Sequence, residues 1–425
     1  MSEIKKLIER LCPEGVEYKK LGEVAKCYSG ATPKTGVAAY WENGTIPWMN
    51  SGEVNSGRVF QTEKKITQAG FESCSTKMVP PHTVVIALAG QGKTRGTVAI
   101  TEIELCTNQS LCAVEVNESI VNSYFLWHYL RGQYQTLRKI SSGDGTRGGL
   151  NQIMIRNFEI PVPPIEVQSK IVEILDNFTE LEAELEAELE ARRKQYEYYR
   201  NQLLTFDLPD GKAGKDKGAR FDVKWMKLGE ICEIRGRIGF RGYTRNDQVS
   251  KGEGVLSLSP ANIVNETMIY TTNTYITWEK YEESPEIKTY EGDIIFCKTG
   301  STVGKVALVE KLPCEATINP QLVVLKNIKV NTRFLKHILA SYDTQVKVKS
   351  LAGVGSVPNI SQAKLASLLI PIPPLEEQQR IVSILDRFEA LTTDLQSGLP
   401  AEIAARRKQY EYYREKLLTF KRKTA

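Results

Sequence analysis

The longest regular pattern of hydrophobic positions lies in residues 165–206. Apolar side chains recur there every three or four residues, with one step of seven, which is typical of a helix with a coiled-coil seam. The seam consists of Ile171, Ile174, Phe178, Leu181, Leu185, Leu189, Tyr196, Tyr199 and Leu203. At ~1.5 Å per residue, a helix of these 42 residues would be about 63 Å long. Because no single globular domain could cover such a helix, we expect a partner helix.

The candidate partner lies in the second half of the chain, because the helical segment is duplicated. Ala191–Phe206 and Ala405–Phe420 are identical at 14 of 16 positions and lie 214 residues apart. Upstream, Ile160–Phe178 matches Ile370–Phe388 at 12 of 19 positions. Internal repeats of this kind determine the architecture. The chain is therefore predicted to be a tandem duplication, in which each copy is a globular part followed by a long helix.

The pattern in the first globular part is mixed. Residues 4–11 predict a short amphipathic helix, Val84–Leu88 a buried strand, Thr97–Thr101 a second strand and Ser123–Leu137 a helix. Strands with interspersed helices and many turns indicate an α+β fold with mixed α/β domains. The second globular part repeats this outline with different loops.

Proline and glycine mark the boundaries between these parts. Pro161, Pro163 and Pro164 end the first globular part, since proline cannot continue a helix or a central strand. Residues 207–220 are rich in glycine and lysine, as flexible linkers are. We therefore expect a first globular domain at 1–160, a first helical segment at 161–206, a linker at 207–220, a second globular domain at 221–371 and a second helical segment at 372–425.

Charge separates the globular parts from the first helix. The net charge of +5 is modest, but residues 1–160 carry 18 basic and 15 acidic side chains, and residues 212–371 carry 23 and 16. Residues 161–211 carry only 5 basic side chains against 12 acidic ones. A polyanion would therefore be attracted to the globular parts and repelled by the first helix.

Composition points to a cytoplasmic protein without a metal site or cofactor. No apolar run is long enough to span a membrane, and the charged N-terminus lacks the apolar core of a signal peptide. The eight cysteines form no C-x-x-C pair and the three histidines stand alone, whereas zinc needs clustered ligands. We expect buried, reduced thiols.

Two glycine-rich loops invite a nucleotide-binding interpretation, which their residues do not support. Residues 87–94 resemble a P-loop, but alanine replaces the first glycine and a strand follows, whereas the motif needs a helix N-terminus. Residues 300–305 fail the motif in a different way, with one residue too few. Two corresponding loops of this kind favour β-hairpins. No nucleophile, base and orienting group stand out, and residues 319–322 do not supply the Asn/Asp-Pro-Pro-aromatic motif of a methyltransferase. We expect no catalysis.

The same loops suit nucleic acid, because basic and hydroxyl side chains stand beside glycines, where the backbone can approach a phosphate. Arginine in such a loop can also contact guanine in the major groove. For each residue, the alternative is a solvated turn. The candidate DNA contacts are Lys93, Thr94, Arg95, Arg147, Arg235, Arg237, Arg241, Lys298, Ser301 and Lys305.

Over its whole length the chain resembles the specificity subunit of type I restriction–modification systems. The resemblance rests on the doubled Pro-x-Pro-Pro, on the helix that follows it and on the repeated segment ARRKQYEYYR. It implies two target-recognition domains, each of which reads one half of a split site in double-stranded DNA. It also implies two antiparallel helices that form a coiled-coil spacer and dock two methyltransferase subunits, and later endonuclease–translocase subunits. The family subunit is not an enzyme. Because the two globular domains differ outside framework positions, the site should be asymmetric.

The repeated tyrosine-rich turns are candidates for binding a common partner, and packing between the two helices is the alternative. These residues are Arg192, Tyr196, Tyr198, Tyr199, Arg406, Tyr410, Tyr412 and Tyr413. Two other classes of function stay open on the residues alone. One is a self-contained DNA-modifying enzyme, and the other is a coiled-coil scaffold that does not bind DNA.

Overall fold

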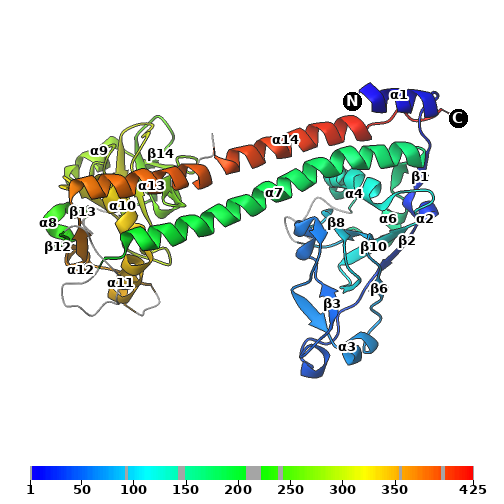
Figure 1. The fold of residues 1–425 in the computed structure, drawn as a ribbon, viewed down its shortest axis with the longest axis horizontal. Coiled ribbons are helices and arrows are strands. Elements are labelled where there is room, and N and C mark those ends of the chain that lie inside the picture. Colours follow the sequence, from blue (N-terminus) through cyan, green and yellow to red (C-terminus); the bar gives the residue numbers. More distant parts are fainter. Residues whose placement is uncertain are drawn as a thin grey trace. The chain divides into compact units, whose positions relative to one another are not determined.

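The structure is a computed structural model that describes residues 2–90, 94–141, 149–206, 222–237, 243–353, 357–393 and 398–424. The chain forms two compact α+β units, drawn in Figure 1. Unit 1 contains Met1–Glu184 and Ala404–Ala425, and unit 2 contains Leu185–Ile403. Each unit therefore combines one globular domain with segments of the long helices. The five-part division expected from the sequence stays a prediction.

The globular part of unit 1 is built around a five-stranded sheet with the order β2-β10-β7-β8-β4. Its strands are β2 (Ala25–Ser29), β10 (Leu111–Val116), β7 (Val84–Ala87), β8 (Val98–Thr101) and β4 (Arg58–Val59). A second sheet contains β5 (Lys64–Ile66), β3 (Ile46–Met49), β9 (Leu105–Thr107) and β6 (Met78–Val79), and β1 (Tyr18–Lys20) pairs with β11 (Glu159–Pro161). The short helices are α1 (Ser2–Leu11), α2 (Leu21–Val24), α3 (Gln68–Glu72), α4 (Ser123–Gly132), α5 (Tyr134–Ile140) and α6 (Gln152–Arg156).

Unit 2 has a corresponding pair of sheets, with one more strand in the main sheet and a different strand order in the second. Its main sheet has the order β13-β22-β19-β20-β17-β16. These strands are β13 (Glu233–Gly236), β22 (Leu322–Lys326), β19 (Ile294–Cys297), β20 (Val306–Leu308), β17 (Thr267–Met268) and β16 (Ile263–Val264). The second sheet contains β14 (Gln248–Val249), β18 (Thr274–Ile276), β15 (Val255–Leu258) and β21 (Ala316–Ile318), and β12 (Lys224–Lys227) pairs with β23 (Leu369–Ile372). The helices are α8 (Leu228–Ile231), α9 (Trp278–Glu282), α10 (Thr332–Ala340), α11 (Tyr342–Ala352) and α12 (Gln362–Ala366).

The pairing of the strands confirms that the two domains are copies of one design. In unit 1, β7 pairs antiparallel with β8, which pairs in parallel with β4. In unit 2, β19 pairs antiparallel with β20, which pairs in parallel with β17. Every residue of β7 and β19 is buried, as continuous apolar runs predict for central strands. Both glycine-rich loops are thus hairpin loops, as expected.

Three long helices complete the units: α7 (Ile165–Leu204), α13 (Leu375–Thr393) and α14 (Leu399–Leu418). In unit 1, Val167, Ile171 and Leu175 from the start of α7 share a core with Tyr410, Leu417 and Leu418 from α14. In unit 2, Ile381 and Leu385 of α13 share a core with Tyr196 and Leu204 from the end of α7. Each domain is therefore covered by the start of its own helix and by the end of the helix from the other repeat.

Two expected helices are each divided. The helix predicted at 123–137 ends at Gly132, and α5 begins at Tyr134; glycine costs about 1 kcal/mol relative to alanine inside a helix. The second long helix consists of α13 and α14, with residues 394–397 outside the described part of the chain. Pro400 is the second residue of α14, a position where a missing backbone N–H is tolerated.

The residues after α14 close unit 1. The Val16 N–H donates to the Lys421 carbonyl at 2.8 Å, and the Lys423 N–H donates to the Val16 carbonyl at 2.9 Å. The expected linker at 207–220 lies outside the described residues. Among the helices that are described, none is long and apolar enough to cross a membrane.

Candidate nucleic-acid interface

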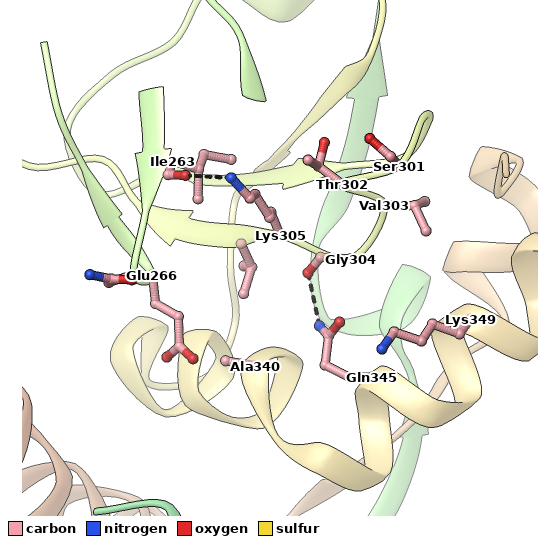
Figure 2. A pocket seen from close by; sticks show the side chains of 12 residues that line it. Ile263, Glu266, Ser301, Thr302, Val303, Gly304, Lys305, Ala340, Gln345 and Lys349 are labelled. Atoms are coloured by element: carbon pink, nitrogen blue, oxygen red, sulfur yellow. Dashed lines mark hydrogen bonds between the residues drawn. The ribbon is translucent and has the colours of Figure 1, made fainter. Parts of the chain in front are cut away.

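The β19–β20 loop, residues 298–305, lies against helix α11 in unit 2. The Gln345 side chain of α11 donates from Nε2 to the Gly304 carbonyl at 2.8 Å, as Figure 2 shows. Gly304 has a φ of +96°, and a Cβ atom there would lie 2.3 Å from Gln345 Oε1. The positive φ favours glycine, because side chains with a Cβ rarely adopt it. The glycine at position 304 is therefore explained by its backbone conformation and by its close contact with α11.

A cavity of about 440 Å³ opens beside this loop (Figure 2). Two candidate DNA contacts from the sequence, Ser301 and Lys305, line it together with Gln345 and Lys349 of α11. Lys305 Nζ donates to the Ile263 carbonyl at 3.0 Å, which ties the loop to the β16–β17 hairpin. Lys349 is exposed. Sequence reasoning missed it, although the alternation of valine and lysine in residues 346–349 was a signal of a basic surface on a helix.

The acidic residue at this cavity is already paired. Glu266, in the turn between β16 and β17, accepts from Arg200 Nη1 of α7 at 2.5 Å. The carboxylate is therefore compensated, so Lys305 and Lys349 supply the positive charge at the cavity, and the hydroxyl groups supply neutral hydrogen-bond donors. Such an arrangement can hold a phosphate oxygen of a nucleic-acid backbone.

The remaining candidate DNA contacts divide into exposed and buried residues. Arg235 is exposed on β13 and pairs with Glu233 at 2.7 Å, and Lys298 and Thr94 are half-buried. Arg237, by contrast, is only 6% exposed. It donates from Nε to the Ile318 carbonyl at 3.1 Å and from Nη2 to Thr317 Oγ1 at 3.2 Å.

Burial lowers the pKa of Arg237 from its ordinary value. Its contacts join the residue that follows β13 to β21, and Arg95 is buried as well. The other three candidates, Lys93, Arg147 and Arg241, lie outside the described residues.

A buried polar cluster joins the first domain to α7 and α14 in unit 1. The sequence analysis did not predict this cluster. His128 of α4 lies 2.9 Å from Asp176 of α7 through Nε2, and 2.9 Å from the Tyr410 hydroxyl of α14 through Nδ1. The carboxylate can only accept, so Nε2 carries the proton and Nδ1 accepts from the tyrosine. Burial lowers the pKa of His128, which keeps the ring neutral.

Unit 2 contains the same cluster. His337 of α10 contacts Asp386 of α13 at 2.9 Å through Nε2, and its Nδ1 lies 3.4 Å from the Tyr196 hydroxyl of α7. Burial lowers the pKa of His337 too. The signal in the sequence was the Phe-Leu-x-His motif shared by residues 125–128 and 334–337.

Three acidic or imidazole groups in unit 2 are close enough to suggest a metal site. The ligand atoms of His337, Asp386 and Glu389 lie within 4.8 Å of one another. However, Lys336 Nζ donates to both carboxylate oxygens of Glu389 at 2.6 Å, and Arg333 pairs with Asp386 at 3.1 Å. Protein cations already compensate these carboxylates, so the geometry favours an ion-pair network.

The tyrosines of the repeated segment have three different environments. Tyr196 and Tyr410 are 8% and 2% exposed and lie in the clusters just described. Tyr199 stacks on Phe388 at 5.5 Å and Tyr413 on Phe178 at 5.2 Å. Only Tyr198 and Tyr412, 58% and 56% exposed, present most of their side chains to solvent.

The two arginines of the partner-binding prediction make local contacts along their helices. Arg192 contacts Gln195 at 3.0 Å, and Arg406 contacts Gln409 at 3.2 Å. Both are half-buried. These contacts leave the expected role in partner binding untested.

Comparison with known proteins assigns the chain to a family. The model of the type I restriction modification DNA specificity domain matches residues 13–191 and 222–405, one copy in each repeat. The chain belongs to this family. It is 34% identical over 288 residues to the EcoR124I/EcoR124II specificity subunit of Escherichia coli, which covers 66% of this chain and 68% of that protein.

Solved structures show the same fold. One chain, from a study of complex assembly and conformational transition in the type I R-M system, has a TM-score of 0.60 at 17% identity and covers 95% of this chain and 97% of its own length. The type I S subunit from M. genitalium has a TM-score of 0.53 at 15% identity, with 95% and 96% covered. The match of the family model to both repeats confirms the resemblance inferred from the sequence.

Proposed function

We propose that this protein is the non-catalytic DNA-recognition subunit of a type I restriction–modification complex. The observation that carries the proposal is the match of the DNA specificity domain to both repeats. Each globular domain reads one half of an asymmetric split site in double-stranded DNA. The long helices set the gap between the halves and dock two methyltransferase subunits, which are joined later by endonuclease–translocase subunits.

The excess of basic residues in the globular parts supports DNA binding by these domains. In the second domain, we assign backbone contacts to Ser301, Lys305 and Lys349, because they surround one cavity beside a hairpin loop. Arg235 and Lys298 are further candidates in this domain, and Thr94 is one in the first. Arg95 and Arg237 are left out of the proposed surface, because their side chains are buried.

Binding to methyltransferase subunits is assigned to the exposed tyrosines of the repeated helical segment. Tyr198 and Tyr412 occupy equivalent positions, and large exposed aromatic side chains are common anchors of protein interfaces. Two equivalent anchors on one chain suit two copies of the same partner. Tyr196 and Tyr410 are not part of the proposed partner-binding surface, because each is buried against a globular domain.

The half-site assignment is tested by domain exchange in the assembled methyltransferase complex. When residues 1–160 are replaced by the first domain of another family member, methylation mapping is expected to show a change in one half-site only. A change in both halves, or in neither, would contradict the modular interpretation. Replacement of residues 221–371 is the matched experiment and should change the other half.

A salt titration separates DNA recognition from the scaffold alternative. Since binding to phosphates releases counterions, the logarithm of the binding constant should fall linearly with the logarithm of salt concentration. The variants K305Q and K349Q should each reduce the slope by about one, and this reduction should not depend on the DNA sequence. No DNA binding by the methyltransferase complex at low salt would favour the scaffold. Methyl transfer by this chain alone would favour a self-contained enzyme.

A further inference from the structure

The tyrosine clusters connect each recognition domain to the repeat to which it does not belong. Tyr410 belongs to the helical segment of the second repeat, yet its side chain lies in unit 1 against the first domain. Tyr196 belongs to the helical segment of the first repeat, yet it lies in unit 2 against the second domain. This crossed arrangement occurs twice in one chain with the same residue types.

The contacts of Tyr410 are those of a fixed anchor. Its hydroxyl contacts His128 Nδ1 at 2.9 Å and accepts from Arg131 Nη1 at 3.2 Å. The Arg131 guanidinium lies 4.9 Å from the centre of the Tyr410 ring and 4.9 Å from that of Trp127. A buried hydroxyl with two such partners allows one orientation of the ring, because leaving a buried polar group unpaired is costly.

The contacts of Tyr196 follow the same plan. Its hydroxyl lies 3.4 Å from His337 Nδ1, and the Arg200 guanidinium lies 5.0 Å from the centre of its ring. Arg200 also donates a hydrogen bond to Glu266, which lies in the turn beside the cavity of Figure 2. Tyr196 therefore contacts the second domain in two ways. One contact is with His337 on α10, and the other is through Arg200 to Glu266.

Both histidines lie on helices that pack against the strands of the candidate DNA-binding loops. Helix α4, with His128, packs on β7 and β8, which flank residues 88–97. Helix α10, with His337, packs on β20, which directly follows residues 298–305. A shift of the tyrosine would therefore reach these loops through one helix and one strand.

We propose that Tyr410 is a positioning residue for the half-site read by the first domain, and that Tyr196 is a positioning residue for the half-site read by the second. Neither tyrosine contacts DNA in this proposal. Each holds the recognition domain of the other repeat in its orientation on the helices. The inference rests on the proposed function, in which each domain reads one half-site.

The test uses the full chain in the methyltransferase complex, with DNA duplexes mismatched at one base pair of either half-site. The domain exchange described above first assigns each half-site to its domain. Y410F, which keeps the ring and removes the hydroxyl, is expected to reduce discrimination against mismatches in the first domain's half-site by about tenfold. Discrimination at the other half-site should stay at the wild-type value.

Y196F should show the reverse pattern, with a smaller effect because its hydrogen bond is longer, 3.4 Å against 2.9 Å. Y290F, at an exposed tyrosine that belongs to neither cluster and to no proposed binding surface, is the control and should change neither half-site. If Y410F affects both half-sites equally, or only the half-site of the second domain, the crossed assignment is wrong. A merely structural role would lower stability without separating the half-sites.

If a variant loses DNA binding, amide hydrogen exchange on the isolated full chain still tests which domain each tyrosine holds in place. Y410F should increase exchange in α4, β7 and β8 and leave β19 and β20 unchanged, and Y196F should do the opposite. Equal increases in both units would overturn the inference. A failure of the proposed function would instead be seen in the domain exchange, which involves neither tyrosine.

Discussion

At the residue scale, two buried histidines show how this protein uses titratable groups for packing. His128 and His337 accept from a tyrosine and donate to an aspartate, and burial lowers the pKa of each. Other charged groups surround them. Arg131 and Arg414 lie near His128, and Lys336 and Glu389 lie near His337.

The lowered pKa values predict that acid destabilises the fold. Between the pKa of the folded state and the ordinary value near 6.5, the unfolded chain binds more protons, so stability falls as the pH falls from 7 toward 5. Each histidine contributes up to about 1.4 kcal/mol per pH unit in this window. Thermal unfolding at a series of pH values should show this slope.

Glutamine substitutions identify the groups responsible for the slope. The variant H128Q/H337Q should be less stable than the wild type at pH 7, but its stability should depend less on pH between 5 and 7. H82Q removes the third histidine, which is exposed and lies in neither cluster, and measures how the loss of a histidine elsewhere changes stability. An unchanged slope in the double variant would contradict the role of the two clusters.

The Phe-Leu-x-His motif marks both histidines in the sequence, but their partners could not be predicted, because they are far away along the chain. His128 is 48 residues from Asp176 and 282 residues from Tyr410. Local patterns do not reveal such pairings. Nor could the sequence distinguish exposed Arg235 on β13 from buried Arg237 two residues later, because the partners of Arg237 lie 81 and 80 residues away.

At the element scale, the two units use different side chains at one equivalent position between domain and helix. Unit 2 has a buried ion pair, Lys336 of α10 with Glu389 of α13 at 2.6 Å. Unit 1 has Trp127 on α4 and Thr179 on α7 at the corresponding positions. A recognition domain therefore fits best on the helix of its own repeat, because a mismatched pair would bury a charge without its partner.

A double-mutant cycle tests this pairing. K336M should destabilise unit 2 by about 3 kcal/mol, because the Glu389 carboxylate loses the ammonium group that contacts both its oxygens. K336M/E389M should recover most of that loss, since well-packed apolar side chains can replace a buried pair. Thermal and denaturant unfolding of the full chain would measure both variants.

The control for this cycle is an exposed pair of the same chemistry. Lys170 and Glu173 are 2.7 Å apart on the surface of α7, and K170M should cost less than ~1 kcal/mol. If the double variant is as unstable as K336M alone, the loss of stability in K336M is not caused by the unpaired Glu389 carboxylate.

The sequence predicted the strongest elements and missed the interruptions. The apolar run at 84–88 and the repeated glycine loops were sufficient to predict β7 and both hairpins. The break after α4 was not predicted, because hydrophobic periodicity continues through it. Only Gly398 and Pro400 signalled that the second long helix is not uniform.

At the scale of the whole molecule, the continuous helix α7 gives the spacer hypothesis a direct test. Residues 180–191 are three tandem Glu-Leu-Glu-Ala units, and α7 runs through them without a break. Inserting a fourth unit adds about 6 Å and one turn plus roughly 40°, which keeps the seam nearly in register. The unspecified gap in the DNA site should grow by one or two base pairs, since duplex DNA rises about 3.4 Å per base pair.

Methylation mapping of the insertion variant would measure the gap directly, and the specified bases should not change. The matched control is a variant in which one unit is rewritten as Glu-Leu-Lys-Ala, with the length preserved and the gap expected to stay the same. Full activity with an unchanged gap in the longer variant would contradict the spacer hypothesis.

The composition of unit 1 has a consequence for how the protein is made. Its residues come from both ends of the chain, Met1–Glu184 and Ala404–Ala425, whereas unit 2 is one continuous stretch. At about 5–20 residues per second, a ribosome needs roughly 10–40 s to go from the first part of unit 1 to the second. During that time, the apolar surface around His128 lacks Tyr410, Leu417 and Leu418. The first domain to leave the ribosome is therefore the last to be completed, and nascent chains of this protein should depend on chaperones at the first domain more than at the second.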